Sequence, residues 1–83
     1  MISERILDED ERMERADRAY RQRCLREGHG YEIPSRYKST ITGNRLVLRN
    51  CNGVLAIYDI GNDGRLTWVE PTEARVRYYE NNW

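Results

Sequence analysis

Hydrophobic and polar positions follow two different periods in this chain, and the change comes near residue 28. Residues 3–27 contain no glycine, proline, valine or threonine, and their apolar residues recur at helical spacing. From residue 37 onward, apolar and polar residues alternate in short runs that glycine and asparagine separate. The pattern predicts one small α+β domain, 1–83, made of a long charged N-terminal helix (3–27), a linker (28–36) and a β meander (37–83).

The expected helix has clear ends but a narrow apolar stripe. Ser3 can cap its first turn, and Gly28 can end it in a left-handed conformation. Residues 4–11 hold five acidic residues and one arginine, whereas residues 12–26 hold six arginines and two acidic residues, a gradient that complements the helix dipole. The stripe either packs on the following sheet or leaves the helix projecting, to dock on a partner or a second copy. Its members are Ile2, Ile6, Met13, Ala16, Tyr20 and Cys24.

Four strands are expected, at residues 37–42, 45–51, 54–59 and 65–70. Gly43-Asn44 and Asn52-Gly53 are two-residue hairpin turns in this interpretation, and residues 60–64 form the third connection. After Pro71, the alternation over residues 74–79 favours a fifth strand, although Thr72 could instead cap a short helix. A fifth strand would let the meander curl into a small SH3-like barrel.

The expected turns set a register for the sheet. Closing at Asn52-Gly53 places Leu48 opposite Ile57, and the next loop places Ile57 opposite Trp68. These three side chains should therefore pack together. The predicted core face is Tyr37, Ile41, Leu46, Leu48, Leu55, Ile57, Leu66 and Trp68, and the opposite, mixed face is Thr40, Val47, Arg49, Ala56, Tyr58, Thr67 and Val69.

Residues 59–70 match several positions of an EF-hand calcium loop. Asp59, Asp63, Gly64 and Glu70 stand where that loop needs them, but Gly61 lacks the side-chain oxygen of the third position. The flanking residues also look like strands, not helices. We interpret the segment as a turn between strands that binds no cation.

The chain offers few parts for catalysis. His29 is the only histidine, and Cys24 and Cys51 lack the spacing of a metal or redox motif. No apolar run approaches the ~18–20 residues of a membrane span, and the first residues do not resemble a signal peptide. We therefore expect no catalytic residue, metal or cofactor, and a location in the reducing cytoplasm.

Two functions fit this composition, in which 34% of the residues are charged and the net charge is zero. The favoured hypothesis is a non-enzymatic protein–protein interaction module, a regulator or inhibitor that docks on a larger assembly. Compact inhibitors encoded by phages and mobile elements have this size. The partner-binding candidates are Ile6, Asp8, Glu9, Asp10, Glu11, Tyr20, Tyr58, Tyr78, Tyr79 and Trp83. A homodimer is a further option.

The alternative is a single-stranded nucleic-acid-binding module. Arginines alternate with tyrosines in the β half, which is the composition of a stacking platform for bases. The same half carries six acidic residues, however, and its net charge is only +1. A strong electrostatic attraction for phosphate groups is therefore not expected.

Overall fold

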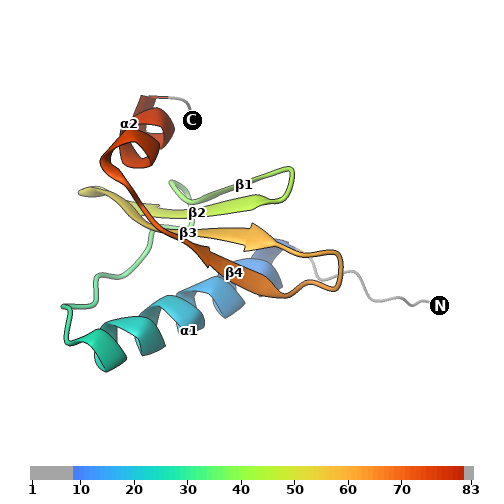
Figure 1. Cartoon of the computed structure of the whole chain (residues 1–83), viewed down its shortest axis with the longest axis horizontal. Helices are drawn as coiled ribbons and strands as arrows, with labels where there is room; N and C mark the ends of the chain where they lie inside the picture. Colours follow the sequence, from blue (N-terminus) through green and yellow to red (C-terminus); the bar gives the residue numbers. More distant parts are fainter. Residues whose placement is uncertain (1–8, 82–83) are drawn as a thin grey trace.

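A four-stranded antiparallel sheet lies between two helices in the computed structural model, which describes residues 9–81 (Figure 1). The strands follow one another in the order β1-β2-β3-β4, so every connection joins neighbours. This arrangement confirms the α+β class. In chain order the elements are α1 (Glu9–Glu27), β1 (Thr40–Thr42), β2 (Arg45–Asn50), β3 (Gly53–Ile60), β4 (Leu66–Val69) and α2 (Glu73–Asn81).

Helix α1 packs along one face of the sheet, as the first of the two alternatives predicted. Met13, Ala16, Tyr20 and Cys24 are buried, and their spacing of three and four residues puts them on one side of the helix. They meet a core cluster on the sheet formed by Leu46, Leu48, Ala56, Tyr58 and Ile60.

The C-terminal end of α1 is the one predicted. Gly28 has a φ of 76°, and the backbone N–H of His29 donates to the carbonyl of Cys24 at 2.9 Å. This bond satisfies a carbonyl that the helix itself leaves unpaired. The predicted cap, Ser3, lies outside the described residues.

The first hairpin has the predicted register, with Ile41 opposite Leu46. The second does not, because Leu48 lies opposite Ala56 and Val47 lies opposite Ile57. The backbone N–H of Asn52 donates to Oδ1 of Asn50 at 2.8 Å, so the turn is made by residues 51 and 52 and closes one residue early, between Asn50 and Gly53. This side-chain bond competes with the two-residue Asn-Gly turn.

A β-bulge also interrupts β3. The register shifts between Leu48 and Arg49, and Leu55 is left without a partner on β2. Both Leu55 and its neighbour Ala56 pack towards the α1 core, which strict alternation forbids.

The predicted packing of Leu48, Ile57 and Trp68 is therefore wrong. Ile57 is fully buried, but it lies on the face turned towards α2, together with Val47. Tyr58 takes its place in the α1 core, where its ring meets the Trp68 ring edge-on at 5.6 Å between centroids. Tyr37, placed in the core by the sequence pattern, is 95% exposed.

Residues 73–81 form helix α2 and not a fifth strand, so the sheet stays open. Thr72 starts the helix, because its Oγ1 accepts the backbone N–H of Arg75 at 3.3 Å and its carbonyl accepts that of Val76 at 2.9 Å. The helix lies across the sheet from α1 (Figure 1). The expectation of a fifth strand is wrong, since the local cap outweighs the alternating pattern.

The connection between β3 and β4 is a tight loop whose polar groups bond to one another. The N–H of Gly61 donates to the carbonyl of Arg65 at 2.8 Å, and the N–H of Arg65 donates to Oδ1 of Asp63 at 3.0 Å. That backbone bond lowers the pKa of Asp63. Trp68 pairs with Tyr58, one residue from the predicted partner Ile57. Among the described residues, no group of three potential metal ligands gathers.

Candidate interaction surface

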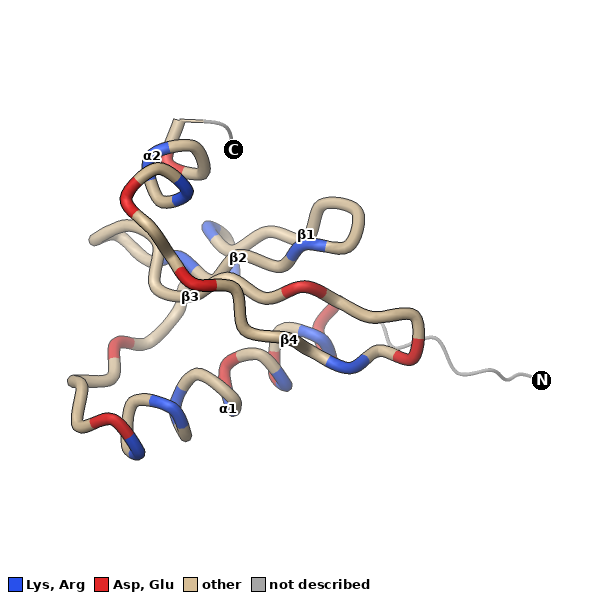
Figure 2. The backbone as a smooth tube through the Cα atoms, in the orientation of Figure 1, with Lys and Arg blue, Asp and Glu red and all other residues tan. Residues whose placement is uncertain are grey.

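Helix α1 carries charges of opposite sign on its two flanks. Acidic and basic residues are interleaved along its backbone (Figure 2), but successive residues are rotated by about 100°. On one side of the buried stripe this rotation collects three acidic residues, Asp10, Glu14 and Asp17, and one arginine, Arg21, whose guanidinium lies over the Tyr31 ring. On the other side it collects the arginines at positions 12, 15, 23 and 26, with Ala19 among them. A chain without net charge thus presents two charged surfaces.

The basic flank borders a shallow hollow of about 610 Å³ between α1 and β4, which we call the arginine groove. Arg15, Arg18 and Arg26 stand exposed on its helical side. Apolar side chains, partly buried, close its floor. Its lining is Arg15, Arg18, Ala19, Gln22, Arg23 and Arg26 from α1, Tyr58 from β3, and Leu66 and Trp68 from β4.

Trp68 is fixed at the floor of the groove by three contacts. The guanidinium carbon of Arg23 lies 3.8 Å from its ring centroid, a cation–π contact, and Arg23 is itself paired with Glu27 at 3.1 Å. The indole N–H donates to Glu70 at 3.4 Å. The Tyr58 ring makes the third contact, in a T-shaped arrangement with the indole. Because Arg23 covers one face of the indole, a base cannot stack on that face without displacing Arg23.

The acidic flank is met by the linker between α1 and β1. A guanidinium N–H of Arg36 donates to Asp10, and the hydroxyl of Tyr31 donates to Asp17 at 2.5 Å. A hollow of about 410 Å³ lies on this side, lined by residues of α1 and of the linker together with Leu48. The linker therefore neutralises part of the acidic flank, whereas the arginine groove faces outward.

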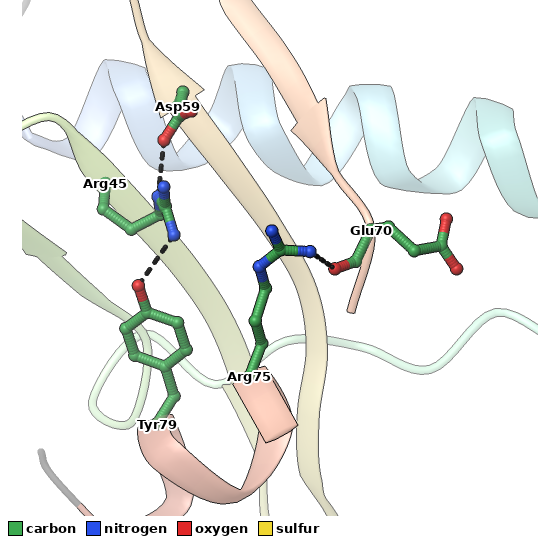
Figure 3. A network of polar contacts seen from close by, with 5 residues as sticks. All are labelled: Arg45, Asp59, Glu70, Arg75 and Tyr79. Atoms are coloured by element: carbon green, nitrogen blue, oxygen red, sulfur yellow. Dashed lines mark hydrogen bonds and ion pairs between the residues drawn. The ribbon is translucent and has the colours of Figure 1, made fainter. Parts of the chain in front are cut away.

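The sheet face opposite α1 is covered by α2 and tied to it by arginines. Arg45 donates to Asp59 at 2.5 Å and to the hydroxyl of Tyr79 at 2.8 Å (Figure 3). Arg75 donates to the carbonyl of Glu70 at 2.9 Å. Arg45 is therefore engaged within the fold, whereas Arg75 is exposed and makes a local bond to the connection between β4 and α2.

Arg49 is buried on the same face and only 3% exposed. Its guanidinium donates to the carbonyl of Lys38 at 3.2 Å, to Oγ1 of Thr40 at 2.7 Å and to the carbonyl of Tyr79 at 2.9 Å. Burial lowers the pKa of Arg49. The side chain therefore joins β2 to β1, the linker and α2.

The predicted partner-binding residues are distributed over several regions. Glu9, Asp10 and Glu11 are exposed at the start of α1, and Tyr78 is exposed on α2. Tyr79 is half-buried against Arg45. The rings of Tyr20 and Tyr58 are core side chains and not surface anchors. Ile6, Asp8 and Trp83 lie outside the described residues.

The arginines of α1 were not among the predicted site residues. Their positions are visible in the sequence, where the gradient from acidic to basic residues indicates an interaction with the helix dipole. What these positions do not reveal is that β4 lies beside them and supplies an apolar floor.

Cys24 and His29 are not brought together as a catalytic pair. The Cys24 thiol is buried beside the Tyr20 hydroxyl, with which it hydrogen-bonds. The imidazole Nε2 of His29 is exposed and lies 3.4 Å from Glu27.

Because two tyrosines are buried, we expect the free energy of unfolding to fall at alkaline pH. Burial raises the pKa of Tyr58 to about 12, and burial with a hydrogen bond to Cys24 raises the pKa of Tyr20 to about 12. Between pH 10 and 12 the unfolded chain loses these protons while the folded chain keeps them, so stability falls as pH rises. We expect each tyrosine to contribute roughly 2 kcal/mol to that loss. Urea denaturation at several pH values measures it, and Tyr58→Phe should make the slope shallower; an unchanged slope would contradict the assignment.

Neither described helix is both long and apolar enough to cross a membrane. The features that remain as a candidate site are the arginine groove and the strand that borders it. No protein-family model matches the chain, and neither a curated protein nor a solved structure shows significant similarity to it.

Proposed function

We propose that this chain is a non-enzymatic protein–protein interaction module, a small regulator or inhibitor that docks on a larger protein assembly through the arginine groove. The observation that carries the proposal is the groove itself, in which exposed arginines stand over an apolar floor. Arginine and tryptophan are enriched at the centres of protein interfaces, where apolar contact and directional hydrogen bonds combine.

Charge on the groove favours one kind of partner. Arg15 and Arg18 lie about one turn apart and Arg26 lies about two turns further along α1, so they present a positive stripe to a ligand in the groove. Such a stripe speeds encounter with acidic surfaces and disfavours basic ones. The exposed guanidinium groups can each bind a carboxylate through two hydrogen bonds.

The nucleic-acid alternative is weakened by the packing of the sheet. A single-strand platform needs an open sheet face with stacked aromatic rings. Here α1 covers one face and α2 the other, and Arg23 covers an indole face of Trp68. The arginine groove itself remains positively charged, so a nucleic-acid control belongs in the test.

The test is affinity capture from an extract of the source organism after nuclease treatment. Wild-type protein is compared with the double variant Arg15→Glu/Arg18→Glu and with Arg75→Glu/Arg77→Glu, which makes the same change of charge on exposed positions of α2. Circular dichroism first shows that all three fold.

We expect one protein or a small set to be captured by the wild type and by the α2 control, and to be lost with the groove variant. Capture that the groove variant retains would contradict the proposal. Capture that disappears on nuclease treatment would support the nucleic-acid alternative instead.

A further inference from the structure

Strand β4 is an open edge beside the arginine groove, and we propose that it binds an acidic extended segment of the partner protein by strand addition. The inference rests on the proposed function and specifies how the partner is held. The added strand would pair with the backbone of β4 and place acidic side chains against the arginines of α1.

The two edges of the described sheet differ in how they are protected. Strand β1 is only three residues long, and the linker beside it is tied to β2 by the bond from Ser35 N–H to the carbonyl of Arg49 at 2.7 Å. Strand β4 pairs with β3 alone among the described strands. Its sequence, Leu-Thr-Trp-Val, contains no charge and no proline, and its pairing contains no bulge. Soluble proteins usually protect an edge with a charge, a proline or a bulge, and none of these lies within Leu66–Val69, so β4 is the less protected of the two described edges.

The lengths of the strand and of the arginine stripe agree. Four strand residues span about 13 Å, and the eleven steps from Arg15 to Arg26 along α1 span about 16 Å. Leu66 and Trp68 are the β4 residues that line the groove, so the intervening residues face the other side of the sheet. A strand added outside β4 would likewise direct every second side chain into the groove, towards the arginines.

The arginines select an acidic strand and oppose self-association. In an antiparallel, two-fold pairing of two β4 edges, both copies of α1 would lie on the same side of the joined sheet. The arginine stripes would then face each other, and like charges at close range are unfavourable. A strand with glutamate or aspartate at alternate positions would instead place negative charges close to the arginines, which is favourable. The phosphates of a nucleic acid could neutralise the arginines, but a nucleic acid has no peptide backbone to extend the sheet.

The experiment uses the full chain with Trp83→Phe, so that Trp68 is the only fluorescent tryptophan. The probe is an eight-residue peptide of alternating glutamate and valine, capped at both ends, and its matched control has glutamine for glutamate. We expect the glutamate peptide to change Trp68 fluorescence saturably at ~150 mM salt and to bind at least tenfold more tightly than the glutamine peptide.

Protein variants test the arginines in the same assay. Arg15→Glu/Arg18→Glu should weaken binding of the glutamate peptide at least tenfold, whereas Arg75→Glu/Arg77→Glu should change it less than twofold. Equal binding by all three proteins would overturn the proposal.

Two further peptides test strand pairing. One is N-methylated at its glutamates and the other at its valines, so each lacks the N–H groups along one edge. Strand addition uses one edge only, so one peptide should lose binding and the other should keep it. Retention by both, or loss by both, would exclude pairing to β4.

The outcomes separate this inference from the proposed function. Absence of peptide binding, together with capture from extract that still depends on Arg15 and Arg18, would refute strand addition and leave the interaction module standing. Capture that does not depend on these arginines would refute the module. Oligothymidylate that binds more tightly than the glutamate peptide would show that the groove recognises phosphate, and would overturn the inference.

Discussion

Replacing Leu48 with alanine is expected to lower the free energy of unfolding by about 2–5 kcal/mol. Leu48 is 1% exposed in the core between the sheet and α1, so truncation removes apolar contacts and leaves a cavity. A domain of this size has a total stability of only about 5–10 kcal/mol, so the variant should be close to unfolding. Ile57→Ala should cost a similar amount, because Ile57 is fully buried on the other face.

The double variant Leu48→Ala/Ile57→Ala distinguishes the observed register from the one predicted from sequence. Leu48 and Ile57 lie on opposite faces of the sheet, so their effects should add to within about 0.5 kcal/mol. Urea denaturation of the wild type, both single variants and the double variant gives the coupling. A coupling above about 1 kcal/mol would place the two side chains in one cluster and contradict the bulged register.

Arg49→Ala is expected to lower the free energy of unfolding by about 2–4 kcal/mol. Three described acceptors, from β1, the linker and α2, receive hydrogen bonds from this one guanidinium. Removing it leaves buried carbonyl oxygens without a donor and opens space beneath α2. Thermal and urea denaturation measure the loss.

Two controls test whether the forked shape of Arg49 matters. Arg49→Lys keeps the charge but cannot reach three separate acceptors in the same geometry, so it should recover less than half of the loss. Arg75→Ala removes an exposed arginine and should cost less than about 0.5 kcal/mol. An Arg49→Ala protein as stable as the wild type would show that the bonds to β1 and α2 do not hold these elements in place.

Elements with strong local signals were predictable from the sequence. Helix α1 ends at Glu27 because Gly28 provides the left-handed residue, and this requirement is local. The first hairpin pairs Ile41 with Leu46 because Gly43-Asn44 fixes its turn. In both cases a few neighbouring residues decide the conformation.

The register of the second hairpin depends on a side-chain hydrogen bond and a β-bulge, which the composition does not reveal. Asn52-Gly53 is a strong turn signal, yet the side chain of Asn50 bonds to the backbone of Asn52 and closes the turn earlier. The bulge at Leu55 then moves both Leu55 and Ala56 towards α1. A shift of one residue exchanges the two faces of a strand, which explains why the alternating pattern predicts the wrong face for both Ile57 and Tyr58.

The C-terminal segment and the candidate site depend on long-range contacts. Alternation over residues 74–79 favoured a strand, but Thr72 caps a helix there and Tyr79 bonds to Arg45 across the sheet. The arginine stripe of α1 could be counted in the sequence. Its apolar floor could not, because Leu66 and Trp68 are some forty residues away and reach α1 only through the sheet topology.

Amide hydrogen exchange along β4 is the most direct test of strand addition at the arginine groove. We expect the glutamate–valine peptide to slow exchange of amides within Leu66–Val69 at least tenfold, with little change on α2. The Arg15→Glu/Arg18→Glu protein should show no such protection at the same peptide concentration. Unchanged exchange in β4 when the peptide is bound, or protection confined to the acidic start of α1 or to α2, would contradict binding at this edge.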